Sequence, residues 1–299
     1  MSCPVQFLDL QSGGRIAWEE CGDPQGTPVF FFHGWPASRL QGEGFDVTAR
    51  ELGVRIISPD RPGIGLSTFQ ANRKLLDWPP VIAQIAQHLG IERFRVLAIS
   101  GGGPYAFATA WALREQVKAA CVISGAPPLP PELDHAALFA VYRLLLSVYR
   151  KQPGLLRLAF RCARPVVTRR PPQWLWPLML KLTARSDTKV LRDPCIFEAS
   201  YNCYRESWRG SALGVATDGE IYAEPWGFDV SEIQTPIRLW HGKEDRSFRW
   251  ELAAELAGKL PHCNTHIVEN EGHYSLPIRH RREILEDLLR FPSTAGALE

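Results

Sequence analysis

The chain has 299 residues, of which 45% are hydrophobic and 22% are charged, a balance typical of a globular protein with a large core. The formal net charge is only +2, which is too small to indicate a nucleic acid partner. No stretch approaches the roughly 18 uninterrupted apolar residues that a membrane span needs. Two basic clusters, residues 161–170 and 279–282, are expected to be solvated faces.

The cysteines and the N-terminal residues indicate in which cellular compartment the protein is expected. The cysteines are scattered, odd in number and without a CxxC pair, so neither a zinc site nor a disulfide framework is indicated. Residues 1–6 lack the basic and apolar regions of a signal peptide. We therefore expect reduced thiols, a cytoplasmic protein and no metal. The seven cysteines are Cys3, Cys21, Cys121, Cys162, Cys195, Cys203 and Cys263.

Strand and helix patterns alternate through the first part of the chain. Residues 5–10 and 15–21, separated by Ser12-Gly13-Gly14, predict a β-hairpin at a sheet edge. Residues 78–89 show the apolar spacing of an amphipathic helix. Apolar runs typical of buried strands occur at residues 29–32, 54–58, 94–97 and 118–124.

The alternation stops for about a hundred residues after Pro127, which is far longer than an ordinary connection. Residues 135–149 and 155–167 are expected to be helical, and residues 196–208 carry the aromatic residues Phe197, Tyr201, Tyr204 and Trp208. Several prolines, Pro165 and Pro177 among them, are expected to break these helices. The segment is rich in aromatic residues, which suits either a substrate pocket or packing against the main domain.

Regular alternation resumes at Pro236. Strands are predicted at residues 237–240 and 264–268, and helices at 249–259 and 279–290. Such alternation predicts an α/β fold with a mostly parallel, doubly wound, eight-stranded sheet. We expect residues 1–126 and 236–299 to form the core domain and residues 127–235 to form an inserted helical cap.

Ser100 lies between a predicted strand and a helical pattern, in the stretch Ala98-Ile99-Ser100-Gly101-Gly102-Gly103. A serine flanked by small residues at a strand-to-helix turn is typical of the nucleophile elbow of hydrolases, although Ala98 departs from the usual glycine. The alternative is a glycine-rich phosphate loop. No lysine follows the glycines and GxGxxG is absent, so we favour the elbow.

A serine nucleophile needs a base to accept its proton and an acid to orient that base. Asp245 follows the predicted strand 237–240, and His273 follows the last strand. Both therefore belong to the sheet edge where open α/β sheets place their sites. Glu244 is a rival acid that we expect to point elsewhere. The order Ser100, Asp245, His273 is that of α/β-hydrolase triads.

An oxyanion needs two backbone N–H donors. Gly101 follows the nucleophile and supplies one, and we assign the other to Trp35, in the loop after the predicted strand 29–32. His33 is expected to tie loops together rather than to act in catalysis.

With these residues in place, the chain resembles α/β-hydrolases of the capped, single-domain type. The matching stretches are His33-Gly34-Trp35-Pro36, residues 60–67, the Ser100 elbow, residues 241–245 and Gly272-His273. The resemblance implies the fold, the triad and the oxyanion hole, and it implies no cofactor. It also implies that the segment near Asp60 shapes the base of the site.

The first hypothesis is a serine hydrolase that acts on an ester, thioester or related acyl bond of an apolar small molecule. The same triad also allows carbon–carbon bond hydrolysis, acyl transfer or cyclisation, and a small-molecule receptor could retain the fold. A serine at position 100 argues against epoxide and carbon–halogen chemistry, because the related enzymes use an aspartate there. The sequence does not indicate the oligomeric state.

Overall fold

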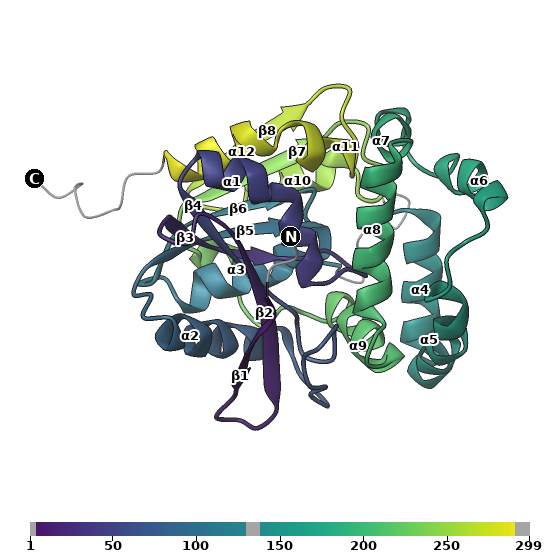
Figure 1. The fold of residues 1–299 in the computed structure, drawn as a ribbon, viewed down its shortest axis with the longest axis horizontal. Coiled ribbons are helices and arrows are strands. Elements are labelled where there is room, and N and C mark those ends of the chain that lie inside the picture. Colours follow the sequence, from purple (N-terminus) through teal and green to yellow (C-terminus); the bar gives the residue numbers. More distant parts are fainter. Residues whose placement is uncertain (1–3, 130–137, 291–299) are drawn as a thin grey trace, which may run out of the picture.

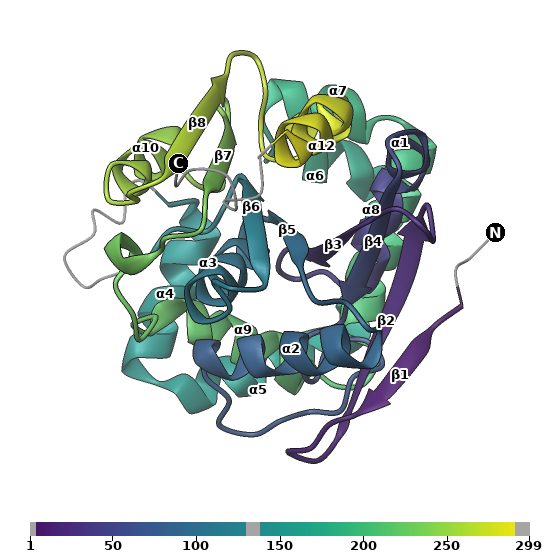
Figure 2. The same ribbon diagram turned by 90° about the vertical axis from the view of Figure 1, so that its left-hand side faces the viewer.

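A single sheet of eight strands runs through the molecule, in the order β1-β2-β4-β3-β5-β6-β7-β8 (Figure 1, Figure 2). The structure is a computed structural model that describes residues 4–129 and 138–290. All strands from β4 onward in this order pair in parallel, and β1 and β2 form the predicted antiparallel hairpin. The predicted mostly parallel eight-stranded sheet is thus confirmed. The strands are β1 Gln6–Asp9, β2 Arg15–Gly22, β3 Thr27–Phe32, β4 Val54–Pro59, β5 Phe94–Ile99, β6 Val117–Ile123, β7 Ile237–Gly242 and β8 Cys263–Val268.

Helices cover both faces of the sheet, as a doubly wound fold requires. Buried side chains of α2 (Trp78–His88), α3 (Gly103–Ala112) and α10 (Trp250–Ala257) pack on one face. Those of α1 (Asp46–Glu51) and α12 (Arg281–Leu289) pack on the other. Within the described residues, no helix combines the length and apolar character needed to cross a bilayer. Shorter helical elements are η1 Arg39–Phe45, η2 Leu75–Asp77, η3 Ser100–Gly102, η6 Val230–Glu232 and α11 Ser275–Arg279.

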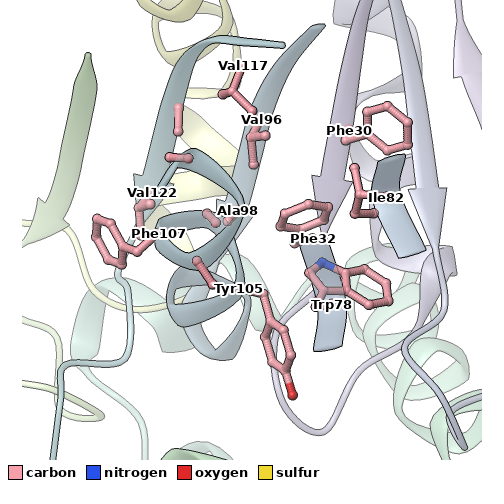
Figure 3. Packing of buried hydrophobic residues seen from close by; sticks show 14 of the residues in the cluster. Phe30, Phe32, Trp78, Ile82, Val96, Ala98, Tyr105, Phe107, Val117 and Val122 are labelled. Atoms are coloured by element: carbon pink, nitrogen blue, oxygen red, sulfur yellow. The ribbon is translucent and has the colours of Figure 1, made fainter. Parts of the chain in front are cut away.

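Aromatic side chains fill the larger core beneath the central strands (Figure 3). The rings of Phe30 and Phe94 lie 4.7 Å apart, and those of Phe32 and Trp78 lie 5.5 Å apart. Tyr105 of α3 borders this cluster, and its hydroxyl group points away from the strands (Figure 3). Because these strands are buried on both faces, they are predominantly apolar in the sequence.

Between β6 and β7 the described residues form six α-helices, which we call the inserted helices, on one side of the sheet (Figure 1). Four of them, α6 to α9, have no counterpart among the helices that the sequence predicted by residue range in this segment. Pro165 does not end its helix, since α5 continues through it to Val167, and Pro177 lies in the first turn of α6, where its missing N–H is not needed. The first residues of the predicted helix at 135–149, residues 135–137, lie outside the described residues, as do residues 1–3. The inserted helices are α4 Ala140–Lys151, α5 Pro153–Val167, α6 Trp176–Leu180 (after η5 Gln173–Leu175), α7 Arg185–Leu191, α8 Pro194–Ser207 and α9 Ala212–Ala223.

Candidate active site

Ser100 lies at the carboxyl end of β5, where η3 leads into α3. Its φ of +53° is in the left-handed region, which L-residues other than glycine rarely adopt. The turn is tight, because a methyl group on Gly102 would lie 2.1 Å from the carbonyl oxygen of Phe32. The strand-to-helix turn therefore requires the small neighbours that the sequence provides, and Ala98 is accommodated in it as a fully buried residue.

The structure brings the three sequence-predicted residues together through two hydrogen bonds. His273 Nε2 is 3.0 Å from Ser100 Oγ, and His273 Nδ1 is 2.8 Å from Asp245 Oδ2. The residues come from loops after β8, β5 and β7, and all three side chains are buried. The second carboxylate oxygen of Asp245 accepts the backbone N–H groups of Ser247 and Phe248. The result is a continuous hydrogen-bonded chain from serine to carboxylate.

The pKa values of Asp245 and His273 shift in opposite directions. Burial alone raises the pKa of Asp245, but the neighbouring His273 and the hydrogen bonds to the carboxylate hold that pKa below its usual value. Burial alone lowers the pKa of His273, but the Asp245 charge and hydrogen bond raise it above the usual value. The carboxylate therefore stabilises a protonated imidazole beside Ser100.

Two other polar residues near the site behave as expected. Glu244 is exposed, and its carboxylate accepts the backbone N–H of Ser186 instead of approaching His273. His33 is fully buried, and its ring nitrogens contact the carbonyl oxygen of Gly34 and the backbone N–H of Arg61. Burial lowers the pKa of His33 well below its usual value, so this histidine is neutral and joins two loops.

Asp187 of α7 is a site residue that sequence reasoning missed. Its buried carboxylate accepts the backbone N–H groups of His273, Tyr274 and Ser275, at 3.1, 2.8 and 2.9 Å. The loop that carries His273 is thus held by an inserted helix. No local pattern marks Asp187, because its partners lie more than 80 positions away in the chain.

The two N–H groups assigned to an oxyanion lie on facing loops. A methyl group on Gly101 would lie 2.8 Å from Trp35 Cβ and 2.6 Å from the hydroxyl oxygen of Tyr222. Within residues 4–129 and 138–290, neither the Trp35 N–H nor the Gly101 N–H has a hydrogen-bond acceptor. Both donors are therefore available to a ligand beside Ser100. Pro36 lies in a turn, and the next helix, η1, begins three residues later.

A buried ionic cluster joins α9 to the loop of Trp35. Asp218 of α9 accepts hydrogen bonds from Arg61, Arg73 and the hydroxyl group of Tyr105. The guanidinium group of Arg61 also donates to the carbonyl oxygens of His33 and Gly34, at 2.6 and 2.9 Å. The two arginines hold the pKa of Asp218 at about 2, although burial opposes them. No pattern in the sequence indicated this cluster.

Tyr222, one helical turn after Asp218, extends from α9 toward Gly101. Its side chain is more than nine-tenths buried, and its hydroxyl group has no hydrogen-bond partner within the described part of the chain. Burial raises the pKa of this phenol well above its usual value, so the group carries its proton. The rings of Trp35 and Tyr105 lie 6.0 and 6.2 Å away and fix its position.

Ser100 opens into a cavity of about 70 Å³ whose lining is almost entirely apolar. None of the lining residues is charged. The inner sides of α4 and α5 provide much of the wall, so part of the aromatic content of the inserted helices serves a pocket and part serves packing. In the described ranges, no group of three or more His, Cys, Asp or Glu side chains could hold a metal ion. The lining residues are Trp35, Ser100, Gly101, Ala126, Leu129, Leu138, Tyr142, Leu145, Leu146, Tyr149, Leu156, Phe160, Gly219, Tyr222, Ala223 and Phe248.

Comparison with known proteins agrees with this architecture. A bifunctional esterase/perhydrolase from Acinetobacter calcoaceticus is 22% identical over 95% of this chain and 98% of its own length. The structure of a bromoperoxidase from Bacillus anthracis matches with a TM-score of 0.72 and 20% identity, over 96% of this chain and 99% of that chain. A thermophilic esterase from Thermogutta terrifontis matches with a TM-score of 0.67 and 20% identity, over 95% and 97%. Because the model of the alpha/beta hydrolase family matches residues 29–287, the chain belongs to that family and is expected to be a hydrolase.

Proposed function

We propose that this protein is a serine hydrolase that cleaves an ester, thioester or related acyl bond of an apolar small molecule. The observation that carries the proposal is the hydrogen-bonded chain Ser100–His273–Asp245, which ends at an uncharged pocket. An apolar wall combined with a base-activated hydroxyl group suits an acyl group that is held by burial and attacked at its carbonyl carbon. The esterases among the similar proteins support this reaction class.

In the first half-reaction, Ser100 Oγ attacks the carbonyl carbon while His273 Nε2 accepts the serine proton. The tetrahedral intermediate collapses, the bond to the leaving oxygen or sulfur breaks, and His273 returns the proton to that atom. Asp245 keeps the imidazole in the required tautomer and stabilises its positive charge. An acyl-enzyme ester on Ser100 remains.

In the second half-reaction, a water molecule attacks the acyl-enzyme and gives its proton to His273. The bond between the carbonyl carbon and Ser100 Oγ breaks, the serine regains its proton, and the carboxylic acid leaves. The reaction requires no metal and no cofactor.

Three groups are placed to stabilise the oxyanion of both intermediates. Within the described residues, the N–H groups of Trp35 and Gly101 and the hydroxyl group of Tyr222 have no hydrogen-bond partner, and Trp35 Cβ and the Tyr222 hydroxyl group both lie close to Gly101. Donors that are already fixed before the reaction stabilise a developing charge without reorganisation. We assign Tyr222 as the third donor.

The segment boundaries follow from the same proposal. We assign residues 1–126 and 236–299 to a catalytic core and residues 127–235 to a cap that forms the acyl pocket. Six cysteines in the described ranges are free thiols, which supports a reducing, cytoplasmic location.

Labelling with a fluorophosphonate tests the nucleophile, and hydrolysis of a series of p-nitrophenyl esters tests the reaction. We expect Ser100→Ala to abolish both labelling and turnover. Ser231→Ala, which removes an exposed hydroxyl group in η6, is the matched control and should retain both. Labelling or turnover that persists in Ser100→Ala would contradict the proposal.

A further inference from the structure

Large apolar side chains are exposed on the inserted helices far more than elsewhere. Of twelve such exposed side chains in the described ranges, nine lie between residues 141 and 182. Eight of the nine, which we call the outer face, are 47–73% exposed. They are Val141, Leu144, Leu155, Leu158, Val166, Trp174, Leu178 and Leu182. An apolar concentration of this kind marks an interaction surface more often than chance exposure.

The outer face has helical spacing. Leu155, Leu158 and Val166 recur on one side of α5, while Leu156 and Phe160 on its other side line the cavity. On α4, Val141 and Leu144 face outward, while Leu145 and Leu146 line the cavity. Both helices are therefore apolar on two sides, and only one of these sides is covered by the protein. Figure 1 places α4, α5 and α6 beyond α8, away from the sheet.

The same segment is strongly basic. Residues 138–186 contain ten lysine and arginine residues and no aspartate or glutamate, whereas the whole chain has a net charge of only +2. The remainder of the chain is therefore net acidic. Within the described part of the chain, seven of these cations have no carboxylate partner, namely Arg143, Lys151, Arg161, Arg164, Arg169, Lys181 and Arg185. The cluster 161–170 is thus one part of a larger basic and apolar surface.

We propose that the outer face docks on an anionic phospholipid bilayer, with its leucines at the acyl boundary and its arginines at the headgroups. Basic amphipathic helices with exposed leucine and tryptophan have the composition that binds in this interface. The charge argues against a second copy of this chain as the partner, because two such faces would repel each other. The leucines argue against a nucleic acid, which contacts cations and stacking rings rather than aliphatic side chains.

The docked orientation would also bring the acyl pocket close to substrates that are dissolved in the bilayer. Only α4 and α5 separate the part of the outer face that they carry from the acyl pocket, so an apolar ester dissolved in the bilayer would have a short path to Ser100. This second part of the inference rests on the proposed function, whereas docking itself does not.

The test is co-sedimentation of the full-length protein with vesicles of phosphatidylcholine, with and without phosphatidylglycerol. We expect binding that requires phosphatidylglycerol and weakens as salt rises. The double variant Leu144→Asp/Leu158→Asp and the double variant Arg161→Gln/Arg169→Gln should each bind about tenfold more weakly or worse. Val47→Asp and Arg114→Gln, which alter exposed residues elsewhere, are the matched controls and should bind like the wild type.

Activity on a water-soluble ester should be the same in all four variants, which shows that each folds. Absent binding to the anionic vesicles, or binding that neither double variant weakens, would overturn the docking proposal. The proposal would also be overturned if light scattering showed a dimer that the leucine double variant dissociates. RNA binding that is lost in the arginine double variant and kept in the leucine double variant would overturn it as well. If the vesicles bind but the Ser100→Ala protein still hydrolyses esters, the proposed function fails and docking stands.

Discussion

Asp187 of α7 accepts the backbone N–H of His273 at 3.1 Å, across 86 positions of the chain. An inserted helix therefore positions the proposed catalytic base without touching the reacting atoms. Because the same carboxylate also binds the N–H groups of Tyr274 and Ser275, its loss leaves three buried donors without an acceptor.

For Asp187→Ala we expect a kcat that is about 10- to 100-fold lower, since a small displacement of an oriented base has this effect. The free energy of unfolding should fall by about 1–3 kcal/mol. Asp193→Ala, which removes a carboxylate that caps α8 at the surface, should reduce stability without changing kcat. Steady-state kinetics and urea unfolding measure both quantities. An unchanged kcat in Asp187→Ala would assign this residue to stability alone.

The acid limb of the pH–rate profile should report His273. Asp245 raises the pKa of His273, so activity should be lost as the pH falls through a value above the usual 6.5. Asp245→Asn removes the main cause of the raised pKa of His273. The acid limb of the pH–rate profile of this variant, measured on its residual activity, should therefore move to lower pH. The rate should fall by up to about four orders of magnitude. Glu244→Gln, one residue away, should leave the profile unchanged, and a shift in that variant instead would identify Glu244 as the acid.

Tyr222→Phe removes one hydroxyl group from the proposed oxyanion site. We expect kcat to fall about 100-fold with little change in KM, because the donor acts on the intermediate rather than on the bound substrate. A trifluoromethyl ketone that forms a tetrahedral adduct with Ser100 should bind more weakly by a similar factor. Tyr201→Phe, which removes a buried hydroxyl group of α8 outside the pocket, is the control. A higher KM with an unchanged kcat would make Tyr222 a wall of the pocket only.

Asp218 should make stability depend on acid pH. Its pKa of about 2 in the folded protein lies below the unfolded value, so its contribution is complete above about pH 4 and is lost as the pH falls toward 2. Asp218→Asn leaves two buried arginines unpaired and should reduce the free energy of unfolding by about 3–5 kcal/mol at neutral pH. The variant should also show a shallower loss of stability below pH 4 in urea unfolding. Asp229→Asn, at a fully exposed carboxylate, should resemble the wild type.

Leu146 is a buried wall of the acyl pocket on α4. Leu146→Ala should raise relative activity on longer p-nitrophenyl esters, because it enlarges a cavity of about 70 Å³. It should also lower the free energy of unfolding by about 2–5 kcal/mol, as for other buried leucines. Leu191→Ala, at a buried leucine outside the pocket, should lose stability while keeping the chain-length profile. Identical profiles for the two variants would place the acyl group elsewhere.

The sequence predicts the sheet well because each of its central strands is largely buried on both faces and is therefore predominantly apolar. The proximity of Ser100, Asp245 and His273 was predictable for a related reason. Each follows its own strand, and parallel strands place their carboxyl ends at one edge of the sheet.

The inserted helices are harder to predict. Asp187 and Asp218 act on partners 86 and 157 positions away, and no local pattern records such contacts. The helix α9 is buried on most of its surface and lacks the amphipathic spacing that marked α2. Pro165 predicts the end of a helix, but α5 continues to Val167, because tertiary context can override local propensity.

The inserted helices contact the rest of the protein in two ways, of which the ionic cluster of Asp218, Arg61 and Arg73 exemplifies the first. The helix α9 is tied to the loop of Trp35 by buried charges, α7 to the loop of His273, and α8 to η1 through Cys203 and Ser38. The helices α4 and α5, in contrast, line the pocket mainly with apolar side chains. For a designer of new specificities, residues 138–180 are therefore the segment to exchange between relatives, and residues 185–223 belong with the sheet in any chimaera.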